Sequence, residues 1–509
     1  MEKSTWLCRL AFLAALLAAE ASGFYARGSC PSLTSRLAEA TSNRPSSHAS
    51  RRPRRPRKSC LKAGTVAEER AASSGRSGEQ RGEDRFERWA GEAGIKAPKL
   101  RHAVFADDLV GQLRGLETVE ATSKSEQLVT VPAKAAISLT ASESSPFRSW
   151  VSPEFWDSQQ WYVKLALKLL WERQLGAASA VEGYVNVLPA QGTFETLIHW
   201  TDEELDALKY SKCAASAKRQ RAAWEKLHQD MAARCPEGAG RMVTRDDLVW
   251  ALECVLSRAF NGRFGGGQNS AVLSAGLLLA SGAAYALTEQ PVWALVAALA
   301  LLPLTLPELG SLNSALTGKS TTSSSDYVLV PFVDSMNHVT SAKTELSFSP
   351  VSGDLSVSVD RAYREGEQAY ISYGLKSNDE LLQFYGFVEA DCPADTYVVE
   401  DVAEKLGKDG ASLKEVVIQR GAEVVNAETL ERLRSSFGGE GEDGAIWRAL
   451  HAMCEAELSV VQPDGQAAAG TVKADQEQGG TVRERLALAF RKEKASVLRE
   501  AIRNLERLR

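Results

Sequence analysis

Two groups of strand-like segments lie on either side of a long helical segment, and this order constrains the fold more than any other feature. Residues 104–138 consist of short apolar pieces between polar turns, which predicts short β-strands. Residues 152–257 carry apolar side chains at helical spacing, and strand-like sequence resumes between residues 327 and 372. From about residue 391 to 509 the pattern is mainly helical. We therefore predict an α+β fold, in which a β-rich domain is split by a helical insert and followed by an all-α C-terminal domain.

Two threonines predict where helices of the insert begin. Thr201 and Thr244 each precede acidic residues and then an apolar face. A threonine side chain can accept a hydrogen bond from the free backbone N–H groups of a first helical turn, and acids are favoured in that turn. We expect each threonine to cap a helix.

Length and composition narrow the class of protein. A chain of 509 residues is too long for a single hydrophobic core, so we expect more than one domain. The net charge of -5 argues against a global basic field, and hence against nucleic acid as a partner. The eight cysteines form no CxxC or CxC pair, which argues against a structural zinc site, and we predict no metal. At this density we expect buried, inert thiols and not a disulfide framework.

The N-terminus has the layout of a targeting leader. Basic Lys3 and Arg9 flank the start of an apolar run, and small residues at 21–23 suit a cleavage site, so residues 1–23 are predicted to be a signal peptide. Residues 24–63 are rich in Ser and Arg and poor in acids, as in a transit peptide. Such a bipartite leader resembles those of algae whose plastids lie inside extra membranes, and it predicts a plastid location. A plain secretory leader with a basic linker, or a nuclear signal at 51–58, remains as an alternative.

The segments most informative about function lie in the second group of strands. Residues 329–338 read Leu-Val-Pro-Phe-Val-Asp-Ser-Met-Asn-His, and residues 370–374 read Tyr-Ile-Ser-Tyr-Gly. An apolar strand that runs into Asn337-His338, followed by a strand that ends in Tyr373, resembles the catalytic core of SET-domain protein methyltransferases. Residues 376–388, from Lys-Ser-Asn to Tyr-Gly-Phe-Val, resemble one branch of them, the Rubisco large-subunit lysine methyltransferase family.

The resemblance covers about residues 100 to 509 and implies a chemistry. It implies an S-adenosyl-L-methionine-dependent protein-lysine N-methyltransferase whose partner is a protein substrate. By resemblance Tyr373 is the catalytic residue, because a phenol oxygen at the end of a narrow channel can contact a polarised methyl group and hydrogen-bond the amine. Residues implied to hold the cofactor are Gln112, Leu113, Arg114, Gly115, Arg258, Asp334, Asn337, His338 and Tyr385.

Two of these assignments carry further expectations. Arg258, in a Ser-Arg-Ala-Phe segment, could hold the methionyl carboxylate through its guanidinium. The family's Gly-rich turn before the first strands corresponds here to residues 112–117, where Arg114 and Glu117 depart from the usual pattern. That departure keeps open a different class of function, a non-catalytic SET-fold module that binds a partner protein.

The target side chain is predicted from two apolar residues. By resemblance Phe260 and Val333 line the substrate channel, and apolar residues there favour lysine over histidine. A histidine N-methyltransferase of the same fold is the alternative. Residues 488–494 and Leu498 resemble the closing amphipathic helix of the family's substrate-binding domain.

An insert at about residues 264–324 departs from the family. It contains two uncharged apolar runs, 271–287 and 291–307, each near the lower length limit for a membrane span. The flanking segments must pair in one domain, so only an even number of spans fits, and a two-helix membrane hairpin through 271–307 is one interpretation. A packed helical pair and a wrongly predicted exon are the others. The predicted organisation is a signal peptide at 1–23, a transit-like segment at 24–63, a linker at 64–84, a SET domain at 85–390 with its inserts, and a helical substrate-binding domain at 391–509.

Overall fold

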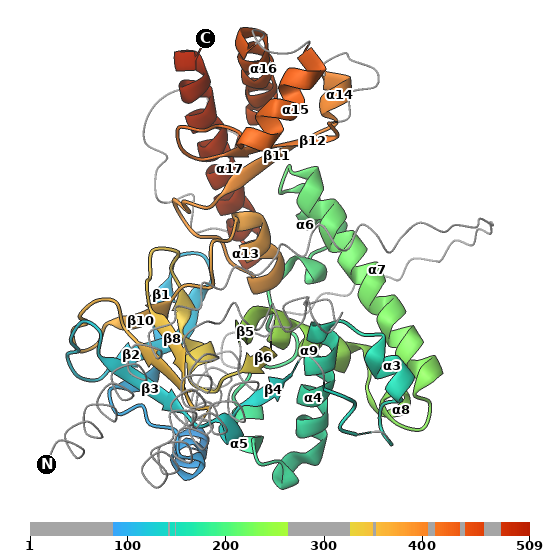
Figure 1. Cartoon of the computed structure of the whole chain (residues 1–509), viewed down its shortest axis with the longest axis vertical. Helices are drawn as coiled ribbons and strands as arrows, with labels where there is room; N and C mark the ends of the chain where they lie inside the picture. The colour runs from blue at the N-terminus through green and yellow to red at the C-terminus, as the bar shows by residue number, and fades with distance from the viewer. Residues whose placement is uncertain are drawn as a thin grey trace, which may run out of the picture.

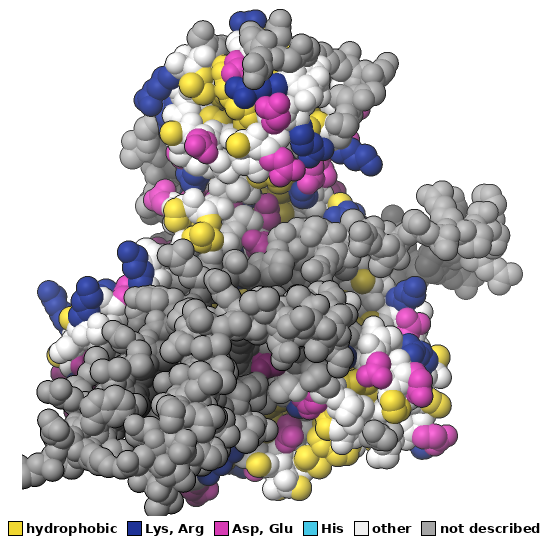
Figure 2. Space-filling model, viewed as in Figure 1, with side chains coloured by type: hydrophobic (Ala, Val, Ile, Leu, Met, Phe, Trp, Pro, Cys, Tyr) yellow, Lys and Arg dark blue, Asp and Glu magenta, His cyan; other side chains and the backbone are white. Residues whose placement is uncertain are grey.

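The structure is a computed structural model, and it describes residues 85–140, 143–147, 149–262, 326–349, 353–405, 413–437, 443–462 and 480–508. Figure 1 shows a β-rich part, a group of helices beside it, and a mainly helical C-terminal part above both. Helix α13 (Asn378–Tyr385) lies where the β-rich and C-terminal parts meet. On the face seen in Figure 2, acidic and basic side chains are interspersed over the C-terminal part.

Three small sheets each join strands from both sides of the helical insert. The largest has the order β1-β2-β10-β7, where β2 and β10 are antiparallel and β10 and β7 are parallel. The other two have the orders β3-β9-β8 and β4-β6-β5. This pairing confirms the predicted α+β fold with a split β-rich core. The strands are β1 (Leu100–Asp107), β2 (Gly111–Thr118), β3 (Gln127–Val131), β4 (Ile137–Leu139), β5 (Ala259–Gly262), β6 (Asp326–Leu329), β7 (Asn337–His338), β8 (Glu345–Phe348), β9 (Leu355–Ser358) and β10 (Gln368–Ile371).

The insert is helical, as its apolar spacing predicts. The Thr201 hydroxyl accepts from the Glu204 N–H, and the Thr244 hydroxyl accepts from the Asp247 N–H, so both predicted caps are confirmed. Short 3-10 turns connect several of its helices. The helices are α3 (Pro153–Asp157), α4 (Trp161–Leu175), α5 (Glu182–Val185), α6 (Asp202–Asp206), α7 (Ser211–Arg234), α8 (Ala239–Met242) and α9 (Arg245–Arg258).

The C-terminal part is mainly helical but contains a sheet, so the prediction that it is all-α is wrong. Strands β11 (Thr396–Glu400) and β12 (Glu415–Gln419) pair antiparallel. Both segments are rich in valine, a β-branched residue that suits strands; β12 buries alternate side chains, and β11 buries its three central ones. The helices after α13 are α14 (Val402–Lys405), α15 (Ala427–Phe437), α16 (Asp443–Val461) and α17 (Val482–Leu508).

The described residues form two hydrophobic cores. The first surrounds the three sheets together with α4 and α9. The second lies among β11, β12, α16 and α17, and it also takes up Tyr210 and Cys213 at the start of α7 and Leu382 of α13. The C-terminal part therefore packs directly on elements of the β-rich domain and of its insert. The five cysteines in the described segments are free and buried, as expected.

The described residues contain no helix with the length and apolarity needed to cross a membrane. The two apolar runs of the expected hairpin, 271–287 and 291–307, lie outside the residues that the structure describes.

Candidate active site

The site is built where the chain after β10 passes β7. Tyr370 and Ile371 pair with Asn337 and His338 in parallel register, and the chain then continues to Tyr373. The Tyr373 N–H donates to His338 Nδ1 at 2.9 Å, and the two rings stack with centroids 4.9 Å apart. The Tyr373 hydroxyl donates to the Met336 carbonyl at 2.9 Å. Tyr373 is thus held at its backbone, along its ring and at its hydroxyl.

Tyr385 at the end of α13 supplies a second ring against Tyr373. Their centroids lie 5.0 Å apart with an interplanar angle of 23°. The helix ends immediately afterwards at Gly386, whose φ of 76° is in the left-handed region that glycine adopts without strain. Burial raises the pKa of Tyr373 to about 12, and the nearby Arg258 cation acts against this rise. The phenol therefore stays protonated at neutral pH.

Arg258, the last residue of α9, is held by Asp334. Its Nη1 donates to the Asp334 carbonyl at 2.7 Å and lies 3.5 Å from the carboxylate. Tyr184 donates to the same carboxylate at 2.9 Å. Burial raises the pKa of Asp334, while Arg258 and the Tyr184 hydroxyl lower it, with a net rise. The Asp334 side chain is 2% exposed, and its carboxylate is directed to Arg258 and Tyr184.

Arg258 keeps one polar atom without a partner. Its Nε is buried and has no hydrogen bond within the described part of the chain. Because a buried guanidinium N–H without a partner is unfavourable, this atom is suited to receive an anionic group of a ligand.

The expected Gly-rich turn is wrong, because residues 112–115 lie within β2. The turn comes earlier, at residues 108–110, and β2 begins directly after it at Gly111, which has a φ of 83°. The strand forms because residues 111–118 pair along their whole length with β1. Exposed Gln112 and partly buried Leu113 face Ala106 and Phe105 in this pairing.

The segment nevertheless reaches the predicted site. The Asn337 amide donates to the Arg114 carbonyl at 3.0 Å. A Cβ atom on Gly115 would lie 2.7 Å from Asn337 Nδ2 and 2.4 Å from Gln368 Nε2. Gly115 is therefore needed for the close approach of β2 to Asn337 and β10. Arg114 donates to the Val187 carbonyl at 2.8 Å, which ties the same strand to the insert.

The two predicted channel residues differ in burial. Phe260 lies on β5, opposite Val328, and is partly buried. Val333, one residue before Asp334, is completely buried in the first core. Phe260 is thus the better placed of the two to line a channel.

Solved structures share this arrangement of strands, insert and C-terminal part. "Structure of Rubisco LSMT bound to AdoMet" has a TM-score of 0.54 and 19% identity, and it covers 84% of this chain and 92% of that one. "Crystal structure of the SET domain of LSMT bound to Lysine and AdoHcy" has a TM-score of 0.53 and 18% identity over 84% and 91% of the two chains. The chain has the SET-domain fold. At these identities the likeness concerns the fold alone.

Sequence comparison finds two curated relatives of related activity. The actin-histidine N-methyltransferase of Drosophila melanogaster is 25% identical over 306 residues, which is 60% of this chain and 48% of the relative. The chloroplastic [fructose-bisphosphate aldolase]-lysine N-methyltransferase of Arabidopsis thaliana is 24% identical over 330 residues, 62% of this chain and 53% of the relative. The chain thus spans about half the length of the curated relatives it matches. No protein-family model matches it.

The candidate site contains residues that the sequence did not point to. Tyr184 orients Asp334 from a helix of the insert, and the Met336 carbonyl fixes the Tyr373 hydroxyl. Thr340 and Glu389 contact each other and His338. Thr340 and Glu389 lie within two residues of quoted motifs, so a wider reading of those motifs could have included them. Tyr184 has no local signal, because it reaches the site only through the fold.

Proposed function

We propose that the protein is an S-adenosyl-L-methionine-dependent protein-lysine N-methyltransferase. The observation that carries the proposal is the placement of Tyr373. Its hydroxyl hydrogen is directed to the Met336 carbonyl, so the lone pairs of its oxygen remain available. A phenol oxygen of this kind accepts weak C–H···O contacts from a polarised methyl group and a hydrogen bond from an amine. The stacked rings of His338 and Tyr385 keep it in position.

The residues around Tyr373 fit the proposed cofactor. S-adenosyl-L-methionine, when bound, supplies a methyl group activated by a sulfonium. The free Nε of Arg258 would hold its carboxylate, with Asp334 acting through Arg258 as a positioning residue. Further contacts would come from the strand at Gln112–Gly115, from Asn337 and His338, and from Tyr385.

Lysine is favoured as the target because the channel residue Phe260 is apolar. A desolvated channel lowers the pKa of a lysine amine, which must be neutral to accept a methyl group. Histidine is the second candidate, favoured by the likeness to the actin-histidine N-methyltransferase. Replacement of Phe260 by Asn should loosen the preference for lysine, and lysine kinetics unchanged in that variant would contradict the assignment.

The proposal is tested by transfer of labelled methyl from S-adenosyl-L-methionine to proteins of a plastid extract. Wild-type protein should label a discrete band, Tyr373→Phe should label it much more slowly, and hydrolysis of the band should yield methyl-lysine. Methyl-histidine would favour the second candidate. Absence of both label and cofactor-dependent thermal stabilisation would favour a non-catalytic partner-binding module.

The mainly helical region from residue 391 is proposed to bind the protein substrate, and the plastid is the proposed location. The leader pattern of residues 1–63 supports that location, together with the chloroplastic relative. A fluorescent protein fused behind residues 1–63 should enter the plastid, and its secretion would contradict the proposal. Membrane attachment through 271–307 stays a prediction, and release of the protein by an alkaline wash of membranes would contradict it.

A further inference from the structure

A line of hydrogen bonds leads away from Tyr373 through His338. Because His338 Nδ1 accepts the Tyr373 N–H, the neutral imidazole carries its proton on Nε2. His338 Nε2 lies 3.1 Å from the Thr340 hydroxyl oxygen, which can accept a hydrogen bond from the Nε2–H group. The Thr340 hydroxyl in turn donates to a carboxylate oxygen of Glu389. Every group in this line has a consistent donor or acceptor role.

Glu389 is well suited to be the fixed acceptor of this line. Its other carboxylate oxygen accepts the Thr340 N–H at 2.7 Å. Burial raises the pKa of Glu389, but hydrogen bonds from His338 and Thr340 outweigh it and lower the pKa to about 2. Glu389 is therefore an anion throughout the range in which the enzyme would be assayed.

The backbone of Glu389 is anchored by Asn378, the first residue of α13. The Asn378 side chain accepts the Glu389 N–H at 2.8 Å and donates to the Glu389 carbonyl at 3.1 Å. Asn378 is completely buried, and its backbone N–H and one side-chain N–H donate to the two carboxylate oxygens of Asp395. The Asn378 side chain thus links Glu389, which follows α13, to Asp395, which directly precedes β11.

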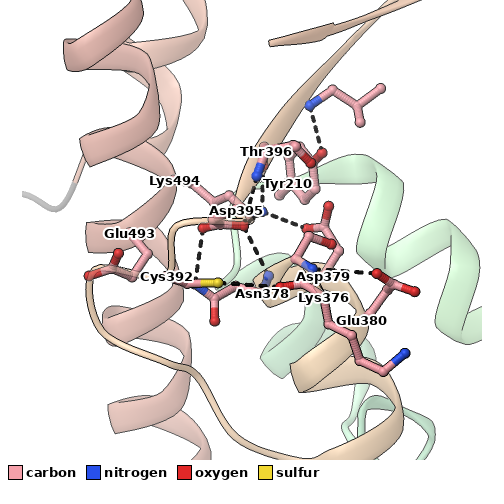
Figure 3. A network of polar contacts seen from close by, with 12 residues as sticks. Tyr210, Lys376, Asn378, Asp379, Glu380, Cys392, Asp395, Thr396, Glu493 and Lys494 are labelled. Atoms are coloured by element: carbon pink, nitrogen blue, oxygen red, sulfur yellow. Dashed lines mark hydrogen bonds and ion pairs between the residues drawn. The ribbon is translucent and has the colours of Figure 1, made fainter. Parts of the chain in front are cut away.

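Helix α17 closes the line at its far end. Figure 3 shows Lys494 pointing between Asp395 and Asp379. Its Nζ lies 2.7 Å from Asp395 and 3.0 Å from Asp379, and all three donor positions of the ammonium are used with the Thr396 carbonyl at 2.6 Å. The C-terminal helix is therefore connected to the ring that supports Tyr373 by an unbroken series of polar contacts.

We propose that Glu389 and Thr340 are positioning residues for His338, which they hold in the tautomer and orientation that support the Tyr373 backbone. The inference rests on the proposed methyltransferase function for its kinetic consequence only. Since α13 and α17 hold Glu389, the C-terminal part acts as a structural support of the transfer site in addition to any contact with substrate.

Thr340 offers a matched pair of variants for the test. Thr340→Val keeps the shape of the side chain but removes the hydroxyl, whereas Thr340→Ser keeps the hydroxyl and removes the methyl group. In the full chain labelled with 15N-histidine, the His338 ring signals, assigned with a His338→Gln variant, should show a proton on Nε2 in the wild type. In Thr340→Val the two ring-nitrogen signals should move toward each other, because Nε2–H has lost its acceptor. In Thr340→Ser they should stay close to wild-type positions.

The kinetic readout separates positioning from cofactor binding. In Thr340→Val we expect kcat to fall about tenfold, while the dissociation constant of S-adenosyl-L-methionine changes by less than about twofold. The contacts of Arg258 and Gly115 are untouched by this variant. Thr340→Ser should recover most of the lost kcat, and Glu389→Gln should lower kcat as Thr340→Val does.

Two results would overturn the inference. One is a wild-type His338 protonated on Nδ1, and the other is a folded Thr340→Val protein with unchanged ring signals and unchanged kcat. Failure of the proposed function looks different. A wild-type protein without methyl transfer would still give the ring signals, which report on the positioning contacts alone.

Discussion

Lys494 of α17 and Asp395 before β11 form an ion pair at 2.7 Å with both side chains completely excluded from solvent. Burial lowers the pKa of Lys494, but the negative charges of Asp379 and Asp395 raise it by more. The net shift is upward, so the ammonium stays charged. A buried pair of this kind is sensitive to the loss of one partner, because the remaining charge stays desolvated. The pair joins the C-terminal core to the β-rich domain at the base of α13.

Removal of this cation should destabilise the fold strongly. Lys494→Met leaves the buried carboxylate of Asp395 facing the partly buried one of Asp379, and we expect a loss of about 3–5 kcal/mol in the free energy of unfolding, measured by denaturant titration. Addition of Asp395→Asn to Lys494→Met should recover part of this loss. As a control, Lys212→Met breaks the more exposed pair with Glu415 and should change stability by only about 0–1 kcal/mol. Equal effects of the two lysine variants would contradict this interpretation.

The acid stability of the protein should depend on Glu389. Its pKa in the folded state is about 2, below the ordinary value of 4.5, so its ionised form contributes stability that is fully present above about pH 4.5. That contribution is lost as the pH falls toward 2. The unfolding free energy of Glu389→Gln should therefore lie below that of the wild type at pH 6, with a gap that narrows between pH 4.5 and 3. A gap that is constant with pH would show that the carboxylate is not stabilised in this way.

Tyr373→Phe should separate turnover from binding. Loss of the hydroxyl removes the oxygen that we propose contacts the methyl group, and we expect kcat to fall about 10- to 100-fold, or roughly 1.4–2.7 kcal/mol. Cofactor affinity should change little, because the ring still stacks between its neighbours. Because burial raises the pKa of Tyr373 to about 12, deprotonation of this phenol should cause no loss of wild-type activity up to pH 9. Full turnover by Tyr373→Phe would remove Tyr373 from the transfer step.

Gly115 should be required for cofactor affinity more than for stability. In Gly115→Ala the new Cβ would displace the ends of the Asn337 and Gln368 side chains and weaken the bond from Asn337 to the Arg114 carbonyl. We expect the dissociation constant of S-adenosyl-L-methionine to rise about tenfold, measured by calorimetry. Gly91→Ala is the matched control, since nothing lies within 4 Å of its added Cβ. Unchanged affinity in Gly115→Ala would show that the crowding is relieved without effect on the site.

Much of the architecture could be read from local spacing. The strand groups, the helical insert and the caps at Thr201 and Thr244 follow from periodicity and from side chains that bond to their own first turn, and these depend on a few neighbouring residues. Asn337, His338 and Tyr373 were found because two short segments carry a recognisable pattern, and the structure brings them together through β7 and β10.

Other features depend on contacts between distant segments. Residues 112–115 were predicted to form a turn because a glycine suits either a turn or a strand. Only their pairing with β1 makes them a strand. The sheet β11-β12 forms because its valines have a core to face, and Tyr184 joins the site because α5 packs beside η5 (Val333–Ser335).

The sequence by itself determined where most helices and strands form and which short segments are candidates for the chemistry, because both are encoded within a few residues. Only the tertiary structure decided that Lys494, a charged residue in an amphipathic helix, is completely buried. A lone lysine would favour the solvated face of α17, since desolvation of an ammonium is unfavourable. It is buried here because Asp379 and Asp395, about a hundred residues earlier in the chain, arrive beside it and compensate its charge.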